Sequence, residues 1–378
     1  MSRLNPVLDR LLRPFTFHQP TWRMCVFGGM LLGMGLAAGL AMAVGLSPWV
    51  AGGAALAGVL ACGLIGLGKA VLTGVENYTF YHYQAGVLGV TAVLLALTHQ
   101  PMLAYLDLIA VALAAALACG RLGCQAGGCC HGRPHRWGVC YEERPYRALG
   151  FTPHLLGVRL FPVQLVESIW LGLIVVSGSW LILTGQAAGS ALAWYVVGYG
   201  GGRFCLEFWR GDGERPYLGP LSTAQWTCLI WLGAAALAEM VGVLPFTGWH
   251  LLLIGGCAAW TAVQFRPGPR ARRAFRAPGH VAEIAQALAA AAAPHISVRQ
   301  TTLGYRFSAE VVGNAALYTL SHESGDMSRE TAVQLADLIV QLRHPGHQAQ
   351  LLPGQGNIFH VLIPTVARQP SPENLLMV

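Results

Sequence analysis

Long apolar runs, separated by short polar segments, dominate the first 265 residues of the chain. Most of these runs are close to the roughly 20 residues that an α-helix needs to cross a bilayer. The pattern predicts an all-α polytopic membrane protein with eight transmembrane helices, or seven if the last two runs form one re-entrant unit. The runs cover residues 24–46, 49–70, 84–99, 101–119, 163–184, 188–208, 222–243 and 247–265.

The character of the chain changes after residue 265. A basic linker at 266–279 leads into segments whose strand-like alternation and helical spacing predict a small soluble α+β domain at 280–366, followed by a tail at 367–378. Ser328 is the expected N-cap of the second helix of this domain. No motif there assigns a function, so a regulatory or partner-docking role is its default interpretation. The expected helices are 280–293 and 328–343, and the expected strands are 296–299, 305–312, 316–321, 348–352 and 358–364.

Residues 1–22 precede the first apolar run and place Arg3, Arg10 and Arg13 among leucines at helical spacing. This pattern predicts an amphipathic helix that lies in the membrane interface. The alternative is a cleavable signal peptide, because residues 41–43 resemble a cleavage site, although the apolar run before them is longer than a signal peptide carries. We therefore expect the transmembrane domain to span residues 23–265.

Composition and charge support the membrane assignment. Only 11% of the residues are charged, against roughly 25% in a typical soluble domain, and the mean hydropathy is +0.50. The arginines flank apolar runs and do not form a basic face, so no nucleic-acid partner is expected. Nearly all lysines and arginines outside the runs fall on one side of an eight-span arrangement. The positive-inside rule would place that side, with both termini, in the cytoplasm.

One stretch, from Gly120 to Cys140, concentrates the residues that are suited to chemistry. It reads GRLGCQAGGCCHGRPHRWGVC and follows directly on an apolar run. We expect a glycine-broken loop here, and irregular backbone at membrane depth must be buried in protein or line a polar cavity. An arginine at that depth is costly and usually functional. The stretch is therefore the expected floor of an active site.

The cysteines of this stretch raise the question of a metal ion. Their spacing, C-x4-C-C-H-x3-H-x4-C, lacks the C-x2-C pairs of structural zinc sites, so neither a metal nor a cofactor is expected. Packing of small residues is the favoured interpretation. A zinc site, a disulfide (Cys124–Cys129 or Cys130–Cys140) and a reactive thiol at Cys129 or Cys130 stay open as alternatives.

Three segments, in order, resemble the signature segments of bacterial prolipoprotein diacylglyceryl transferases. Residues 120–123, with a second Gly-Arg pair at 132–133, are similar to the family's G-R-x-G-N segment. Residues 162–167 (PVQLVE) resemble its P-x-Q-L-Y-E segment, and residues 202–210 (GRFCLEFWR) resemble its R-F-x-x-E-F-x-R segment. The resemblance covers roughly residues 20–245 and leaves the eighth run and the soluble domain outside.

The resemblance implies a multi-pass transferase of the bacterial cytoplasmic (inner) membrane. Such an enzyme moves the diacylglyceryl group of phosphatidylglycerol onto the lipobox cysteine thiol of a prolipoprotein and releases glycerol phosphate. The partners implied are thus the phospholipid, the membrane and a prolipoprotein. The family's site opens to the periplasm, opposite to the side that the charge distribution favours.

The motifs assign expected roles to individual residues. Arginine forks match phosphate geometry, so Arg121 and Arg203 are expected to hold the lipid phosphate and stabilise its departure. Glu207 and Arg210 are expected on the helix face of Arg203, and Glu167 is expected to pair with Arg121 or Arg203. An interfacial arginine cluster and a first-turn glutamate that complements the helix dipole are the alternatives. The expected substrate-binding residues are Gln84, Cys124, Gly132, Gln164, Glu167, Glu207 and Arg210.

The chain departs from the family pattern where the family carries its base. A histidine opens the family's H-G-G-L-I-G segment, and Gln84 takes that place here. Glutamine is not a useful proton acceptor, so we expect His131 or His82 as the base, with His135 as a further candidate. The motif's asparagine is Cys124, its acidic residue is Cys129, and Lys69 replaces an arginine of the second span.

Three functions are compatible with these residues. The first is diacylglyceryl transfer to a lipobox cysteine. The second keeps the lipid donor but uses a different acceptor, as the missing histidine suggests. The third is a non-catalytic membrane protein that binds anionic lipid through the same arginines. Product formation from labelled phospholipid separates the first two from the third.

Overall fold

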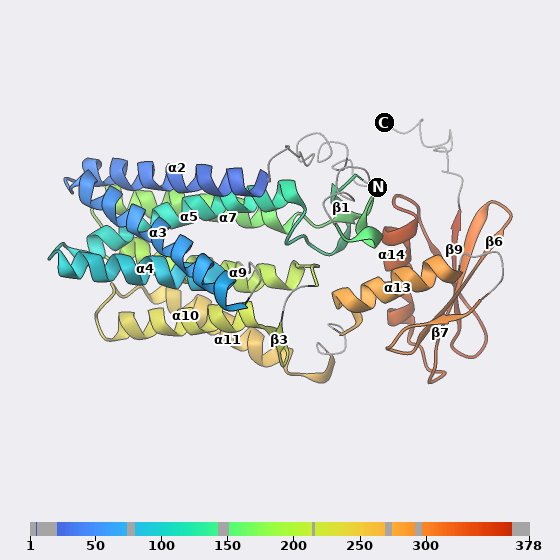
Figure 1. Cartoon of the computed structure of the whole chain (residues 1–378). Helices are drawn as coiled ribbons and strands as arrows, with labels where there is room; N and C mark the ends of the chain where they lie inside the picture. The colour runs from blue at the N-terminus through green and yellow to red at the C-terminus, as the bar shows by residue number, and fades with distance from the viewer. Residues whose placement is uncertain are drawn as a thin grey trace, which may run out of the picture.

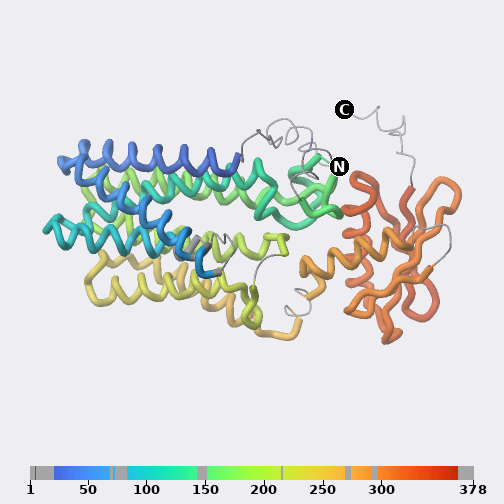
Figure 2. The backbone as a smooth tube through the Cα atoms, viewed as in Figure 1, coloured from blue at the N-terminus to red at the C-terminus, as the bar shows by residue number. Residues whose placement is uncertain are grey.

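The computed structural model has two parts, a helical bundle and a smaller domain that contains a β-sheet (Figure 1). The structure describes residues 5, 21–73, 80–142, 151–213, 216–268, 274–291 and 297–364. The expected interfacial helix at 1–22 lies almost entirely outside the described residues, as do most of the linker arginines and the tail. The backbone path in Figure 2 shows the C-terminal domain, from α13 onward, at one end of the bundle.

Apolar helices follow the predicted runs closely. Among the described residues, four helices are long and apolar enough to cross a membrane: α2, the Pro48–Gly68 part of α3, α5 and α7. The bundle consists of α2 (Thr21–Ala43), α3 (Pro48–Thr73), α4 (Phe80–Leu97), α5 (Met102–Gly127), α7 (Val163–Leu183), a composite helix, α10 (Thr223–Met240) and α11 (Gly248–Gln264). The composite helix joins α8 (Ser190–Trp194), the π-helical turn η2 (Tyr195–Tyr199), α9 (Gly200–Leu206) and the 3-10 turn η3 (Glu207–Trp209).

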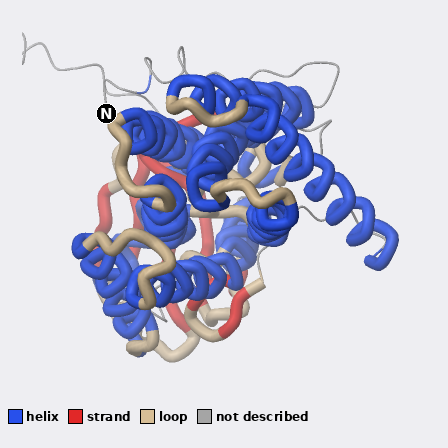
Figure 3. Tube along the Cα trace, turned by 90° about the vertical axis from the view of Figure 1, so that its left-hand side faces the viewer, coloured by secondary structure: helices blue, strands red, loops and turns tan. Residues whose placement is uncertain are grey.

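Helix α5 is the central element of the bundle and packs most extensively against α2. Figure 3 shows the helices of the bundle from its far end, with the strands behind them. Small residues make this approach possible. A Cβ atom on Gly29 would lie 2.7 Å from the Cβ of Cys119, and one on Gly33 would lie 2.6 Å from the carbonyl oxygen of Ala112. Helices in lipid commonly associate by close backbone approach through small residues. Lipid tails are as apolar as the helix surface, so contact between helices gains no hydrophobic free energy and depends on close packing.

The prediction of a loop from residue 120 onward is wrong for its first part. Helix α5 continues through Gly120 and Gly123 to Gly127, so Arg121 and Cys124 are helical residues. Glycine costs roughly 1 kcal/mol per position inside a helix. Packing explains why the helix continues, because a Cβ on Gly123 would lie 2.8 Å from the Cβ of Cys25 on α2. The chain reverses only at Gly128, whose φ of 76° is left-handed.

Short strands lie at the end of the bundle that faces the second domain. Strand β1 (Pro134–Cys140) pairs antiparallel with β2 (Arg159–Leu160), and the 3-10 turn η1 (Pro153–Leu155) lies between them. Strands β3 (Tyr217–Leu218) and β4 (Leu221–Ser222) form a tight hairpin before α10. Ser222 and Gln225 cap α10 reciprocally in a capping box.

The second domain is a five-stranded antiparallel sheet with two helices. The strand order is β5-β6-β7-β9-β8, and Ser328 caps the second helix by accepting a hydrogen bond from the backbone N–H of Thr331, as predicted. The first predicted strand is displaced, because β5 starts only at Arg299. The elements are α13 (Pro278–Ala291), β5 (Arg299–Gln300), β6 (Tyr305–Val312), β7 (Ala315–His322), α14 (Arg329–Arg343), β8 (Gln350–Pro353) and β9 (Phe359–Pro364).

The hydrophobic core of this domain also includes residues from the β1–β2 region. Val139, Tyr141 and Leu160 from the β1–β2 region belong to the same buried apolar cluster as Leu288 of α13 and Leu335 of α14. Burial of such side chains contributes roughly 1.5–3 kcal/mol each. The β1–β2 region therefore shares a core with the C-terminal domain.

Candidate functional site

A buried chain of ion pairs joins the three sequence motifs. The Glu167 Oε1 atom lies 3.0 Å from the Nε of Arg121 and 3.6 Å from the Nε of Arg203. The Nη2 of Arg203 lies 2.6 Å from the Oε2 of Glu207, which is 3.7 Å from the Nη1 of Arg210. All five side chains are buried, at 9% relative exposure or less. The expected pairing of Glu167 with Arg121 or Arg203 is confirmed with both arginines.

Three helices bring Arg121, Glu167 and Arg203 together. Arg121 belongs to the last two turns of α5, Glu167 to the second turn of α7 and Arg203 to α9. The π-helical turn η2 directly precedes α9 and sets the direction of its side chains. Tyr199, the last residue of that turn, donates a hydrogen bond of 2.9 Å to Glu167 Oε1. Single π-helical turns occur frequently at functional sites.

Arg210 joins the cluster from an extended segment. The prediction that it continues the helix face of Arg203 is wrong, because the helix ends at Trp209 and Arg210 is extended at φ −70° and ψ 143°. Arg210 pairs as an isolated β-bridge with Gly132, and its Nε donates to the Oδ1 of Asp212 at 2.9 Å. A Cβ on Gly132 would lie 2.1 Å from the carbonyl oxygen of Phe161, so only glycine fits beside this bridge.

Gln164, expected to bind substrate, supports the turn after α5. Its Nε2 donates to the carbonyl oxygen of Cys129 at 2.9 Å and lies 3.4 Å from the Oη of Tyr141. Tyr141 in turn donates to the carbonyl oxygen of Gln125. The first and second motifs are thus connected through buried hydrogen bonds, which fix the turn relative to α7.

The cysteines of the turn lie closer together than their spacing indicates. All ten cysteines, each within the described residues, are present as thiols, so neither disulfide considered from the sequence is formed. The Sγ atoms of Cys124, Cys129 and Cys130 all lie within 4.8 Å of one another. Hydrogen bonds from the thiols of Cys124 and Cys129, together with the guanidinium groups of Arg210 and Arg121, hold the pKa of the Cys130 thiol well below its usual value.

Of the candidate bases, His131 has the most suitable geometry. It is buried, and its Nδ1 lies 3.0 Å from the carbonyl oxygen of Gly132. A carbonyl only accepts, so Nδ1 carries the hydrogen and Nε2 keeps the lone pair of a base. His135 is enclosed by the rings of Trp137, Phe161 and Trp209. The side chain of His82, like that of Lys69, lies outside the described residues.

Gln84 is buried on α4 at 2% relative exposure. Its Oε1 atom has no hydrogen-bond partner among the described residues. Buried polar atoms are nearly always hydrogen-bonded in native proteins. The Oε1 atom of Gln84 is therefore suited to accept a hydrogen bond from a bound molecule.

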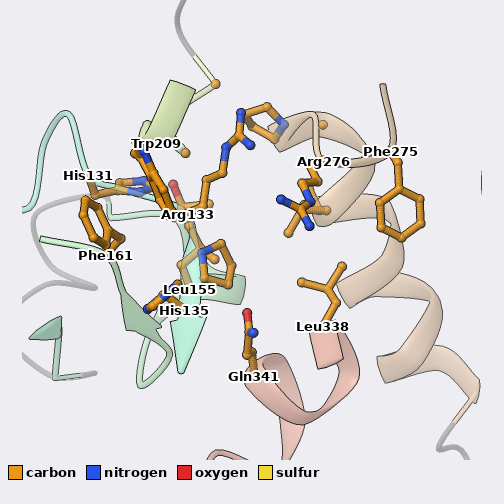
Figure 4. Close-up of a pocket in the computed structure, with 18 of the residues that line it drawn as sticks. His131, Arg133, His135, Leu155, Phe161, Trp209, Phe275, Arg276, Leu338 and Gln341 are labelled. Atoms are coloured by element: carbon orange, nitrogen blue, oxygen red, sulfur yellow. The ribbon is translucent and has the colours of Figure 1, made fainter. Parts of the chain in front are cut away.

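A cavity of about 780 Å³ lies between the end of the bundle and the C-terminal domain. His131, Arg133 and Trp209 line one side, and Arg276 and Leu338 line the other (Figure 4). Trp209 and Gly211 both line it, on either side of Arg210 in the sequence. Burial, reinforced by the nearby His131, lowers the pKa of His154 in the wall, which favours its neutral form.

Several residues of the site were not anticipated from the sequence. Tyr199 stands four residues before Arg203, a helical spacing that could have indicated it. Asp212 stands two residues after Arg210, a spacing that carries no helical or strand signal. The contribution of Arg276 and α14 to the cavity depends on long-range packing, for which local sequence gives no signal.

Known proteins with similar sequences carry one consistent description. The family model for prolipoprotein diacylglyceryl transferase matches residues 82–241. A phosphatidylglycerol–prolipoprotein diacylglyceryl transferase of Clostridium tetani is 35% identical over 130 residues, 34% of this chain and 49% of the relative. A second one, from Clostridium perfringens, is 34% identical over 122 residues, 32% of this chain and 44% of the relative.

The chain thus spans about half the length of the curated relatives it matches. The matched region begins within α4 and ends just after α10, and it contains all three motifs and every charged member of the ion-pair chain. Over residues 82–241 this chain is therefore similar to the prolipoprotein diacylglyceryl transferase family.

Proposed function

We propose that this protein transfers the diacylglyceryl group of phosphatidylglycerol to the cysteine thiol of a prolipoprotein. The observation that carries the proposal is the buried chain Arg121–Glu167–Arg203–Glu207–Arg210, which unites three motifs far apart in sequence. The names of the two relatives support the choice of donor and acceptor.

The proposed reaction forms one bond and breaks one. The acceptor sulfur attacks the glyceryl carbon that carries the phosphate, the C–S bond forms, the C–O bond breaks, and glycerol phosphate leaves with the electron pair. Arg121 and Arg203 stabilise the negative charge on the departing phosphate, and Glu167 and Glu207 hold the two guanidinium groups in position. The Nε2 of His131 takes the thiol proton.

The cavity is the proposed entry for the acceptor. Its wall contains His131, and Trp209 and Gly211 connect it through the backbone to Arg210. Arg276 and α14 form the opposite wall, so the C-terminal domain takes part in acceptor binding. Gln84 accepts a hydrogen bond from bound substrate in place of the family histidine.

We propose an eight-span topology in a bacterial inner membrane. Eight passes place the β1–β2 region, the β3–β4 hairpin and the C-terminal domain on one side, and all three lie at the same end of the bundle in Figure 1. The ion-pair chain then lies near that end of the spans, where a phospholipid head group is located.

The proposal is tested with purified full-length protein, labelled phosphatidylglycerol and a synthetic lipobox peptide. We expect a thioether product, and we expect Arg121→Ala and Arg203→Ala each to lower the rate roughly 100-fold or more, as loss of a charge-stabilising group does. Arg136→Ala changes an exposed arginine of β1 and serves as the matched control. Absence of lipidated peptide, with glycerol phosphate released at the same rate by wild type and Arg121→Ala, would refute the proposal.

A further inference from the structure

The turn that follows α5 brings three thiols to one point. Cys124 lies in the last helical turn, and the chain reverses at Gly128 before Cys129 and Cys130. The three Sγ atoms lie within 4.8 Å of one another. Three sulfur ligands at about 2.3 Å from a metal ion would be roughly 4 Å apart in trigonal geometry and slightly closer in tetrahedral geometry. Movements of about half an ångström or less per sulfur atom therefore bring all three within bonding distance of one ion, as a trigonal shell for Cu⁺ or as three of the four ligands of Zn²⁺.

We propose that Cys124, Cys129 and Cys130 bind a single soft d10 cation, Cu⁺ or Zn²⁺, through their three thiolate sulfurs. Thiolates select these ions from the biologically common ones, because soft ligands bind soft metals preferentially. This inference is independent of the proposed transferase activity.

The backbone supports this assignment independently of the sulfur positions. Cys130 has a φ of 54°, a left-handed conformation that costs a non-glycine residue roughly 1–2 kcal/mol. Such strain persists only where the surroundings over-determine it, and it is concentrated at functional sites. The hydrogen bond from Gln164 to the carbonyl of Cys129 and the one from Tyr141 to the carbonyl of Gln125 hold this turn in place. The ligands are therefore preorganised.

The charges around the cluster fit an anionic metal–thiolate centre. Three thiolates with Cu⁺ carry a net charge of −2, and with Zn²⁺ a net charge of −1. The guanidinium groups of Arg121 and Arg210 lie close enough to interact electrostatically with Cys130. Cys129 is exposed whereas Cys124 is buried, so an ion has a route in from the surface. Binding releases one proton for each thiol that is deprotonated.

The test measures metal binding by reduced, metal-free, full-length protein in detergent, without lipid or peptide. Cu⁺ and Zn²⁺ are added in separate titrations under anaerobic conditions, with Cd²⁺ as a spectroscopic probe of thiolate ligation. We expect one ion per chain, a thiolate-to-Cd²⁺ charge-transfer band, and three sulfur neighbours at about 2.3 Å by X-ray absorption in the zinc-loaded protein. Affinity should fall as pH is lowered, because protons compete for the thiolates.

Single substitutions provide the controls. Cys129→Ser changes an exposed side chain, so the fold is retained, and we expect it to weaken binding roughly 100-fold or more. Cys140→Ser, in the neighbouring strand, and Cys205→Ser, an exposed cysteine of α9, should leave affinity unchanged. Binding that survives in the Cys124→Ser/Cys129→Ser/Cys130→Ser variant would overturn the proposal, as would a spectrum without sulfur ligands. Transferase activity enters none of these readouts.

Discussion

Glu167 is the residue on which the ion-pair chain depends most. Its Oε1 contacts two guanidinium groups, at 3.0 Å and 3.6 Å. At an effective dielectric constant of about 20, each contact corresponds to roughly 5 kcal/mol of attraction before desolvation is counted. Glu167→Gln keeps the shape and leaves an amide oxygen that still accepts from Tyr199, so the change isolates the charge.

We expect Glu167→Gln to destabilise the protein by about 3–5 kcal/mol, because it removes the carboxylate that pairs with the buried Arg121 and one of the two that pair with Arg203. The free energy of unfolding is measured by denaturant titration of the detergent-solubilised protein, followed by tryptophan fluorescence. Glu310→Gln, on an exposed position of β6, is the matched control and should change stability by no more than about 0.5 kcal/mol.

A double variant measures the coupling between Arg121 and Glu167. Arg121→Gln combined with Glu167→Gln removes the guanidinium group that loses its carboxylate partner in the single change. The double variant should therefore lose clearly less stability than the two single losses added together. Strict additivity, or a Glu167→Gln effect no larger than that of Glu310→Gln, would refute the view that Glu167 neutralises the buried arginines.

Three further predictions concern the elements around the site. Gly132→Ala should abolish most transferase activity while the protein stays folded by far-UV circular dichroism, because the added Cβ would lie 2.1 Å from the carbonyl oxygen of Phe161 and displace the bridge to Arg210; wild-type activity would contradict this. Burial, reinforced by His347 and Arg343, lowers the pKa of His344. The C-terminal domain should therefore be most stable above the ordinary histidine pKa of about 6.5 and lose stability as the pH falls below it. His344→Gln should flatten this dependence in thermal melts from about pH 7 to 5. Ser328→Ala should cost about 1 kcal/mol of stability through loss of the cap on α14, and an unchanged denaturation midpoint would show that the cap contributes nothing.

Hydrophobic periodicity predicted most elements because membrane helices are marked by composition itself. The run at 163–184 became α7 at Val163–Leu183, and the alternation at 305–312 became β6 with the same bounds. The predicted end of α5 was wrong because helix propensity alone treats glycines as helix breakers. Tertiary packing of Gly123 against α2 overrides that propensity, and sequence periodicity contains no information about the partner helix.

The candidate site was predictable where residues follow motif order, and less so where geometry depends on the turn. The pairing of Glu167 with arginine followed from the cost of burying a charge. The extended backbone of Arg210 depends on its bridge to Gly132, a partner 78 positions away. The proximity of Cys124 to Cys130 depends on a left-handed residue at Gly128 and another at Cys130 itself, which spacing rules for metal ligands do not consider.

The π-helical turn at Tyr195–Tyr199 separates two registers within one helix. A π turn holds one residue more than an α turn, and each residue rotates an α-helix by about 100°. The apolar packing of α8 before the turn and the charged face after it can therefore be aligned independently. If the turn kept all its residues but closed into a regular α-helix, Arg203 would rotate by about 100° away from Glu167, whereas deletion of one residue would keep its direction. The position of the arginine is thus encoded by a count of residues as well as by their identity.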